Sequence, residues 1–105
     1  LNIAPALVAG PGAVMVDCLT MWLSNLMEAG RDIDAETDTF LEAVENGPQV
    51  ICVSNEIGMG LVPETAIGRK FRDAQGRLNQ RIAARAGRVA FVAAGLPIFL
   101  KGSAP

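Results

Sequence analysis

The sequence predicts a single α/β domain with a largely parallel β-sheet and helices packed against that sheet. Short apolar runs of strand length alternate along the chain with segments of helical periodicity, which is the pattern of βαβ units. Hydrophobic residues make up 50% of the 105 residues and charged residues 19%, so the chain can bury a core and is not expected to be disordered. A chain of this length forms one domain at most.

The first expected strand covers residues 13–16, a continuous apolar run of the kind found in strands that are buried on both faces. Asp17 closes this strand, and its position leaves two interpretations open. It either holds a magnesium ion or the ion's water, as acids at strand ends do in phosphate-handling folds, or it begins the turn and caps the next helix. That helix ends at Gly30. Its apolar face repeats at helical spacing through Leu19, Trp22, Leu23, Leu26 and Met27.

The next segment predicts a surface connection, a short helix and a second strand. Residues 31–38 are polar and acidic, and Asp38 is expected to cap a helix over 39–45. Gly47 and Pro48 end that helix, and the apolar run 49–53 forms the second buried strand.

A loop over residues 53–63 follows the second strand, because Gly58, Gly60 and Pro63 break regular structure. Ligands in open α/β sheets bind at the carboxyl ends of the strands, where this loop is expected to lie. The most distinctive polar residues of the chain fall in or just after it. They are Asn55, Glu56, Arg69, Arg72, Asp73, Asn79 and Gln80.

After the loop the pattern becomes helical, with Pro63 suited to the first helical position. Gly68 and Gly76 interrupt the pattern and predict two joined or kinked helices instead of one straight helix. Residues 88–93 form the third expected strand. Residues 98–100 form the fourth, at a sheet edge because Pro97 has no N–H for a central ladder.

Seven of the nine basic residues lie between Arg69 and Arg88, although the net charge of the chain is −2. The net charge argues against a nucleic-acid-binding surface of the whole chain. Within the basic region, Arg77, Arg81 and Arg85 recur every four residues. This stripe either stays solvated or pairs with acids on a neighbouring element, and anion binding is the alternative.

The chain contains no histidine, and its two cysteines, Cys18 and Cys52, are 34 residues apart. A zinc site therefore has too few ligands, and we expect buried, reduced thiols. The sequence shows no signal peptide and no apolar run near the roughly 18 residues that a membrane span requires, so a cytoplasmic protein is expected. Because the sequence starts at Leu1, we expect a fragment, a processed chain or an incompletely described one.

Three stretches together resemble one known family. They are VDCLTMWLSNL at 16–26, VSNEIGMGLVPE at 53–64 and GRKFRDAQGRLNQR at 68–81. They resemble the bifunctional adenosylcobinamide kinase/adenosylcobinamide-phosphate guanylyltransferases of cobalamin biosynthesis. The resemblance extends over nearly the whole chain from about Ala13 onward.

The resemblance implies a P-loop NTPase-like (RecA-like), mostly parallel sheet flanked by helices. It implies phosphorylation of adenosylcobinamide with ATP or GTP, followed by GMP transfer from GTP through a guanylyl-histidine to give adenosylcobinamide-GDP. Mg²⁺ and a trimeric assembly are implied as well. Asp17 corresponds to an acid beside the nucleotide and the metal, and two loop signatures supply the other nucleotide-binding positions. These are Asn55, Glu56, Arg69, Arg72, Asp73, Asn79 and Gln80.

The family's phosphate-binding loop and its guanylylated histidine lie upstream of everything in this sequence. We therefore expect residues 1–105 to be one partial domain, the C-terminal portion of the enzyme, incomplete at its N-terminal side and inactive without the upstream segment. Such a portion should leave a sheet edge and apolar surface exposed. The alternative is a truncated, non-catalytic oligomerisation module.

Overall fold

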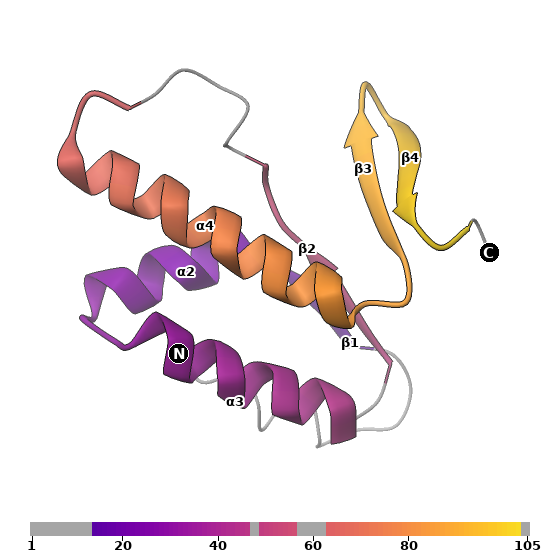
Figure 1. Ribbon diagram of the computed structural model, residues 1–105, viewed down its shortest axis with the longest axis horizontal. Helices are drawn as coiled ribbons and strands as arrows, with labels where there is room; N and C mark the ends of the chain where they lie inside the picture. Colours follow the sequence, from indigo (N-terminus) through magenta and orange to yellow (C-terminus); the bar gives the residue numbers. More distant parts are fainter. Residues whose placement is uncertain (1–13, 47–48, 57–62, 104–105) are drawn as a thin grey trace.

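The computed structural model describes residues 14–46, 49–56 and 63–103. Strands β1 (Val14–Asp17) and β2 (Val50–Val53) form a two-stranded parallel sheet. Three helices accompany the sheet: α2 (Leu19–Glu28), α3 (Ile33–Asn46) and α4 (Ala66–Arg85). A β-hairpin of β3 (Val89–Ala93) and β4 (Leu96–Lys101) follows α4 and forms a separate antiparallel sheet (Figure 1). The α/β class is thus confirmed, and the parallel arrangement is confirmed for β1 and β2 only.

The hydrophobic core lies between the three helices and one face of the β1–β2 sheet. Trp22 and Phe40 meet there with ring centroids 5.4 Å apart. The predicted apolar face of α2 is buried, and Trp22 is a core residue, only 7% exposed. The remaining buried hydrophobic residues are Leu19, Leu23, Leu26, Leu41, Ala74 and Leu78. Alternate residues of the two strands, Val14, Val16, Val50 and Cys52, pack against this core.

Helix α3 begins at Ile33, and the predicted start at Asp38 is wrong. The backbone N–H of Ala35 donates to Asp32 Oδ1 at 3.1 Å, so Asp32 caps the helix. Arg31 Nη2 lies 2.6 Å from Glu36 Oε1 and closes the same first turn. Residues 33–38 of the segment predicted as a surface connection are therefore helical, because the side chain of Asp32, earlier in the chain, accepts one of the free N–H groups of the first turn.

Helix α4 is one continuous helix of 20 residues that begins at Ala66. The predicted start at Pro63 and the predicted break or kink are wrong. Thr65 Oγ1 accepts a hydrogen bond from the N–H of Gly68 at 3.0 Å, which makes Thr65 the N-cap. Gly68 thus belongs to the first turn. Gly76 lies in the middle, where the buried neighbours on the core side of α4 outweigh its low helix propensity.

The β3–β4 hairpin turns at Ala94 and Gly95, whose φ angles of 53° and 74° are those of a type I′ turn. The third strand agrees with its prediction within one residue, whereas β4 begins earlier than predicted and includes Pro97. Lys101 Nζ donates to the carbonyl oxygens of Ala83 at 3.0 Å and Ala84 at 3.2 Å, which ties the hairpin to the C-terminal turn of α4.

Two members of the arginine stripe on α4 pair with acids on α3. Arg81 forms a salt bridge with Asp38, and Arg85 forms one with Glu45. The interpretation as a charged face that pairs with a neighbouring element is therefore confirmed for these two residues. None of the helices in the described part of the chain has the length and hydrophobicity that crossing a lipid bilayer requires.

Candidate functional site at the carboxyl edge of the parallel sheet

The parallel register brings the ends of β1 and β2 to one edge of their sheet. Asp17 pairs in register with Val53, so each strand ends where the other does. The backbone N–H of Asn55 donates to Thr20 Oγ1 at 3.1 Å and joins the segment after β2 to the first turn of α2. Asp17 is exposed at this edge. The structure therefore places Asp17 at the same sheet edge as the start of the first loop signature, residues 53–56.

A hydrogen-bond network from α4 fixes the segment that follows β2. Asn79 Oδ1 accepts from Ser54 Oγ at 2.6 Å and from Gln75 Nε2 at 3.0 Å, and Asn79 Nδ2 donates to the carbonyl oxygen of Asn55 at 3.1 Å. Gln75 Nε2 also donates to Ser54 Oγ at 2.9 Å. Both polar ends of the Asn79 amide are thus engaged with the protein, and Asn79 acts here as a positioning residue.

Sequence reasoning missed three members of this network: Thr20, Ser54 and Gln75. Gln75 has no exposed surface, and its Oε1 has no hydrogen-bond partner among the described residues. Gln75 and Asn79 are four residues apart, which places both on one face of a helix. This spacing is the sequence signal from which a contact between Gln75 and Asn79 could have been predicted.

Arg69 holds the other end of the same loop. Its Nη1 donates to the carbonyl oxygens of Pro63 and Glu64, both at 3.1 Å. Arg69 and Asn79 are ten residues apart on one helix, or about 15 Å along its axis. Helix α4 therefore fixes both ends of the loop. The predicted loop residues Gly58 and Gly60 lie outside the described residues.

The remaining residues of the two signatures differ in their surroundings. Glu56 is exposed just after the bonded Asn55, and Arg72 is partly buried on α4. Both take part in polar or electrostatic interactions. Asp73 and Gln80 are exposed on α4, and their side chains make no hydrogen bond or ion pair with any part of the chain that the structure describes. The structure does not bring these two into the network at the sheet edge.

The two free cysteines have opposite environments. The backbone N–H of Met21 favours the thiolate and lowers the pKa of the Cys18 thiol, which lies beside Asp17 at the start of α2. Burial raises the pKa of the Cys52 thiol, which packs against the core from β2. Both cysteines are free, as expected, but both are only partly buried, so the prediction of buried thiols is wrong.

Acidic ligands are sparse at this edge. Among the described residues, no three Cys, Asp or Glu side chains lie close enough together to hold a metal ion. Mg²⁺ in nucleotide sites is commonly held by one or two carboxylates together with substrate phosphates. Asp17 offers an exposed carboxylate at this edge that could take part in such a site.

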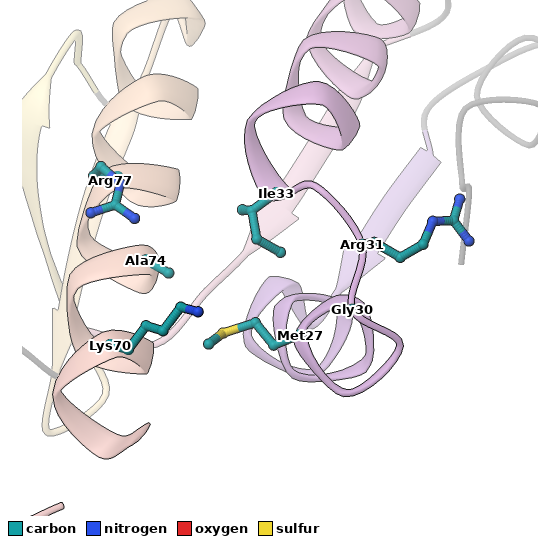
Figure 2. Close-up of a pocket in the computed structure, with 7 residues that line it drawn as sticks. All are labelled: Met27, Gly30, Arg31, Ile33, Lys70, Ala74 and Arg77. Atoms are coloured by element: carbon teal, nitrogen blue, oxygen red, sulfur yellow. The ribbon is translucent and has the colours of Figure 1, made fainter. Parts of the chain in front are cut away.

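A separate pocket of about 200 Å³ lies between α4 and the connection from α2 to α3. Figure 2 shows Lys70 and Arg77 of α4 on one side of this pocket and Met27 of α2 opposite, while the side chain of Arg31 points away. Gly30, Ile33 and Ala74 complete the lining. None of these residues belongs to the network at the sheet edge.

Comparison with known proteins identifies the family. The family model described as cobinamide kinase / cobinamide phosphate guanyltransferase matches residues 2–100. The chain belongs to this family. The match extends over nearly the whole chain and confirms the resemblance that the three sequence stretches indicate.

Three curated members of the cobinamide kinase / cobinamide phosphate guanyltransferase family are similar over most of the chain. The bifunctional adenosylcobalamin biosynthesis protein CobP of Pseudomonas aeruginosa is 45% identical over 92 residues, which cover 85% of this chain and 53% of that protein. The bifunctional adenosylcobalamin biosynthesis protein CobU of Salmonella typhimurium is 36% identical over 110 residues, covering 90% and 61%. CobU of Escherichia coli is 36% identical over 104 residues, covering 84% and 58%. The chain thus spans little more than half the length of these relatives.

Proposed function

We propose that this chain supplies one part of an adenosylcobinamide kinase/guanylyltransferase. The complete unit would phosphorylate adenosylcobinamide with ATP or GTP and then transfer GMP from GTP to adenosylcobinamide phosphate, giving adenosylcobinamide-GDP. Membership of the family supports the reaction class. The observation that supports the site is the shared edge of β1 and β2, where Asp17 and the segment starting at Ser54 lie together.

In this proposal the chain's own residues have two kinds of role. Asp17, Asn55 and Glu56 face the nucleotide from the ends of the two strands, where α/β folds bind their ligands. Asn79 and Arg69 hold the ends of the loop in place, which matters because phosphoryl transfer depends mainly on positioning and charge stabilisation. Arg72, Asp73 and Gln80 remain predicted nucleotide contacts from α4.

Asp17 would also hold Mg²⁺, which when bound supplies positive charge to the phosphates. The guanylyl-histidine step requires a histidine, and the 105 residues contain none. The proposed unit therefore also contains a portion of the family polypeptide that carries the P-loop and that histidine. A RecA-like strand order, a trimeric assembly and a cytoplasmic location belong to the same proposal.

A non-catalytic oligomerisation module is the second candidate. The absence of histidine favours it, because such a module needs the fold and not the nucleophile. It predicts that this chain associates with itself or with a relative but never restores turnover.

The test is kinase activity on adenosylcobinamide after the chain is combined with the complementary portion of the Pseudomonas aeruginosa protein. We define the complementary portion as the part of that protein outside its match to this chain. Activity should appear, and Asp17→Asn should reduce turnover at least tenfold, because it removes the carboxylate charge that would hold the Mg²⁺ ion on the phosphates. Glu42→Gln, an exposed change on α3, is the control that should leave turnover unchanged. Absent activity in a stable complex would favour the non-catalytic module.

A further inference from the structure

The β1–β2 sheet has one covered face and one exposed apolar face. The helices cover the face with Val14, Val16, Val50 and Cys52. Met15, Ile51 and Val53 point to the opposite face and are 64%, 47% and 41% exposed. Parallel sheets occur almost only with both faces covered, so this exposed face is an unfilled contact surface.

The β3–β4 hairpin is also apolar, and on both of its faces. Val92 is opposite Pro97 and Phe91 is opposite Ile98, so neighbouring pairs point to opposite sides. Val92 and Ile98 are 63% and 58% exposed, one on each side. The two strands pack chiefly against each other, and Leu96 and Leu100 add further exposed apolar surface. A two-stranded hairpin of this kind is at best marginally stable alone.

We propose that the free face of β1–β2 and the β3–β4 hairpin are the interface for the complementary portion of the family polypeptide. The length of the relatives supports this occupant. The stretch that matches this chain covers only 53% of the Pseudomonas aeruginosa protein and 61% of the Salmonella typhimurium protein. The chemistry supports it as well, because Met15, Ile51 and Val53 carry aliphatic or thioether groups, and charged residues lie only at the ends of the strands, such as Asp17 of β1 and Lys101 of β4. Such a surface is complementary to apolar strands and helices of an α/β fold and not to an anionic or polar ligand. The inference rests on family membership and does not depend on the proposed catalytic activity.

The chain offers a matched pair of methionines for the test. Met15 on the sheet face and Met21 on α2 are 64% and 62% exposed. The purified chain is titrated with the complementary portion of the Pseudomonas aeruginosa protein, and association is measured by calorimetry and size-exclusion chromatography. Met15→Gln should weaken association about tenfold, because it removes apolar burial at the interface, and Met21→Gln should leave association unchanged. Neither change should alter the denaturation midpoint of the chain alone, since both side chains are exposed.

A second pair tests the hairpin. Leu96→Thr on β4 should weaken association, whereas Ile67→Thr, which changes a residue 79% exposed on α4, should not. Three results would overturn the proposal: no association of the wild-type chain, equal losses in test and control variants, or self-association of the chain that Met15→Gln abolishes. The last result would identify a second copy of this chain as the occupant. Because the readout is binding, a failure here is distinct from a failure of the kinase assay.

Discussion

Replacing Asn79 with alanine should detach the segment after β2 from α4. The variant loses three hydrogen bonds: from Ser54 Oγ, from Gln75 Nε2 and to the Asn55 carbonyl oxygen. At a net value of about 0.5–1.5 kcal/mol each, they sum to roughly 1.5–4.5 kcal/mol. Asn55 is exposed and Ser54 only partly buried, so water replaces some of these bonds. We expect the free energy of unfolding to fall by about 2 kcal/mol.

Urea denaturation followed by circular dichroism measures this change, with an unchanged m-value showing that stability and not compactness has altered. Gln80→Ala is the matched control. Gln80 is adjacent in the same signature and exposed, and its side chain makes no hydrogen bond with the described residues, so Gln80→Ala should change the free energy of unfolding by no more than about 0.5 kcal/mol. Asn79→Asp separates the contributions, because aspartate keeps an acceptor for Ser54 but cannot donate to the Asn55 carbonyl. Equal losses in Asn79→Ala and Gln80→Ala would refute the positioning role.

Three further predictions concern the helices and the thiols. Gly76→Ala should raise the free energy of unfolding by about 1 kcal/mol, because a Cβ there meets no atom within 4 Å. Gly68→Ala should lower the free energy of unfolding, since the new Cβ would lie 2.9 Å from Pro63 Cβ and from the Thr65 hydroxyl oxygen that caps α4. Thermal denaturation of both variants tests whether the two changes in stability have opposite signs. In the folded chain, iodoacetamide should alkylate Cys18 at lower pH than an ordinary cysteine and Cys52 only at higher pH, because the thiolate is the nucleophile. Mass spectrometry of digests measures the alkylated fraction of each cysteine across a pH series. The same pH dependence for both cysteines would contradict the prediction. Arg81→Ala should lower the free energy of unfolding by less than about 1 kcal/mol, because the side chains of Arg81 and Asp38 are 34% and 68% exposed. The decrease should be smaller in high salt, which screens exposed charges. A decrease that salt does not change would contradict a surface ion pair.

The elements that follow from strong periodicity could be predicted from the sequence. The apolar repeat from Leu19 to Met27 sets α2 and its buried face, and the run up to Val53 sets β2. The capping of helices was harder to predict. Asp32 and Thr65 each accept a backbone N–H and decide where α3 and α4 begin, although Asp38 and Pro63 match the usual start signals equally well.

The proximity of two candidate residues was predictable, whereas the hydrogen bonds around them were not. Asp17 and Asn55 follow strands that are adjacent and parallel, so their proximity follows from the fold class. The network through Gln75 and Ser54 depends on which face of α4 turns toward the end of β2. That orientation is set by tertiary packing of Ala74 and Leu78, which local sequence patterns do not contain.

The most direct test of the central claim is nuclear magnetic resonance of the isotope-labelled chain bound to the complementary portion of the Pseudomonas aeruginosa protein. Adding GTP and Mg²⁺ should shift the amide signals of residues 17–20 and 54–56 more than any others in the described segments. Shifts confined to the pocket near Lys70 and Arg77, or no shifts at the sheet edge at saturating GTP, would contradict a nucleotide site at the carboxyl ends of β1 and β2.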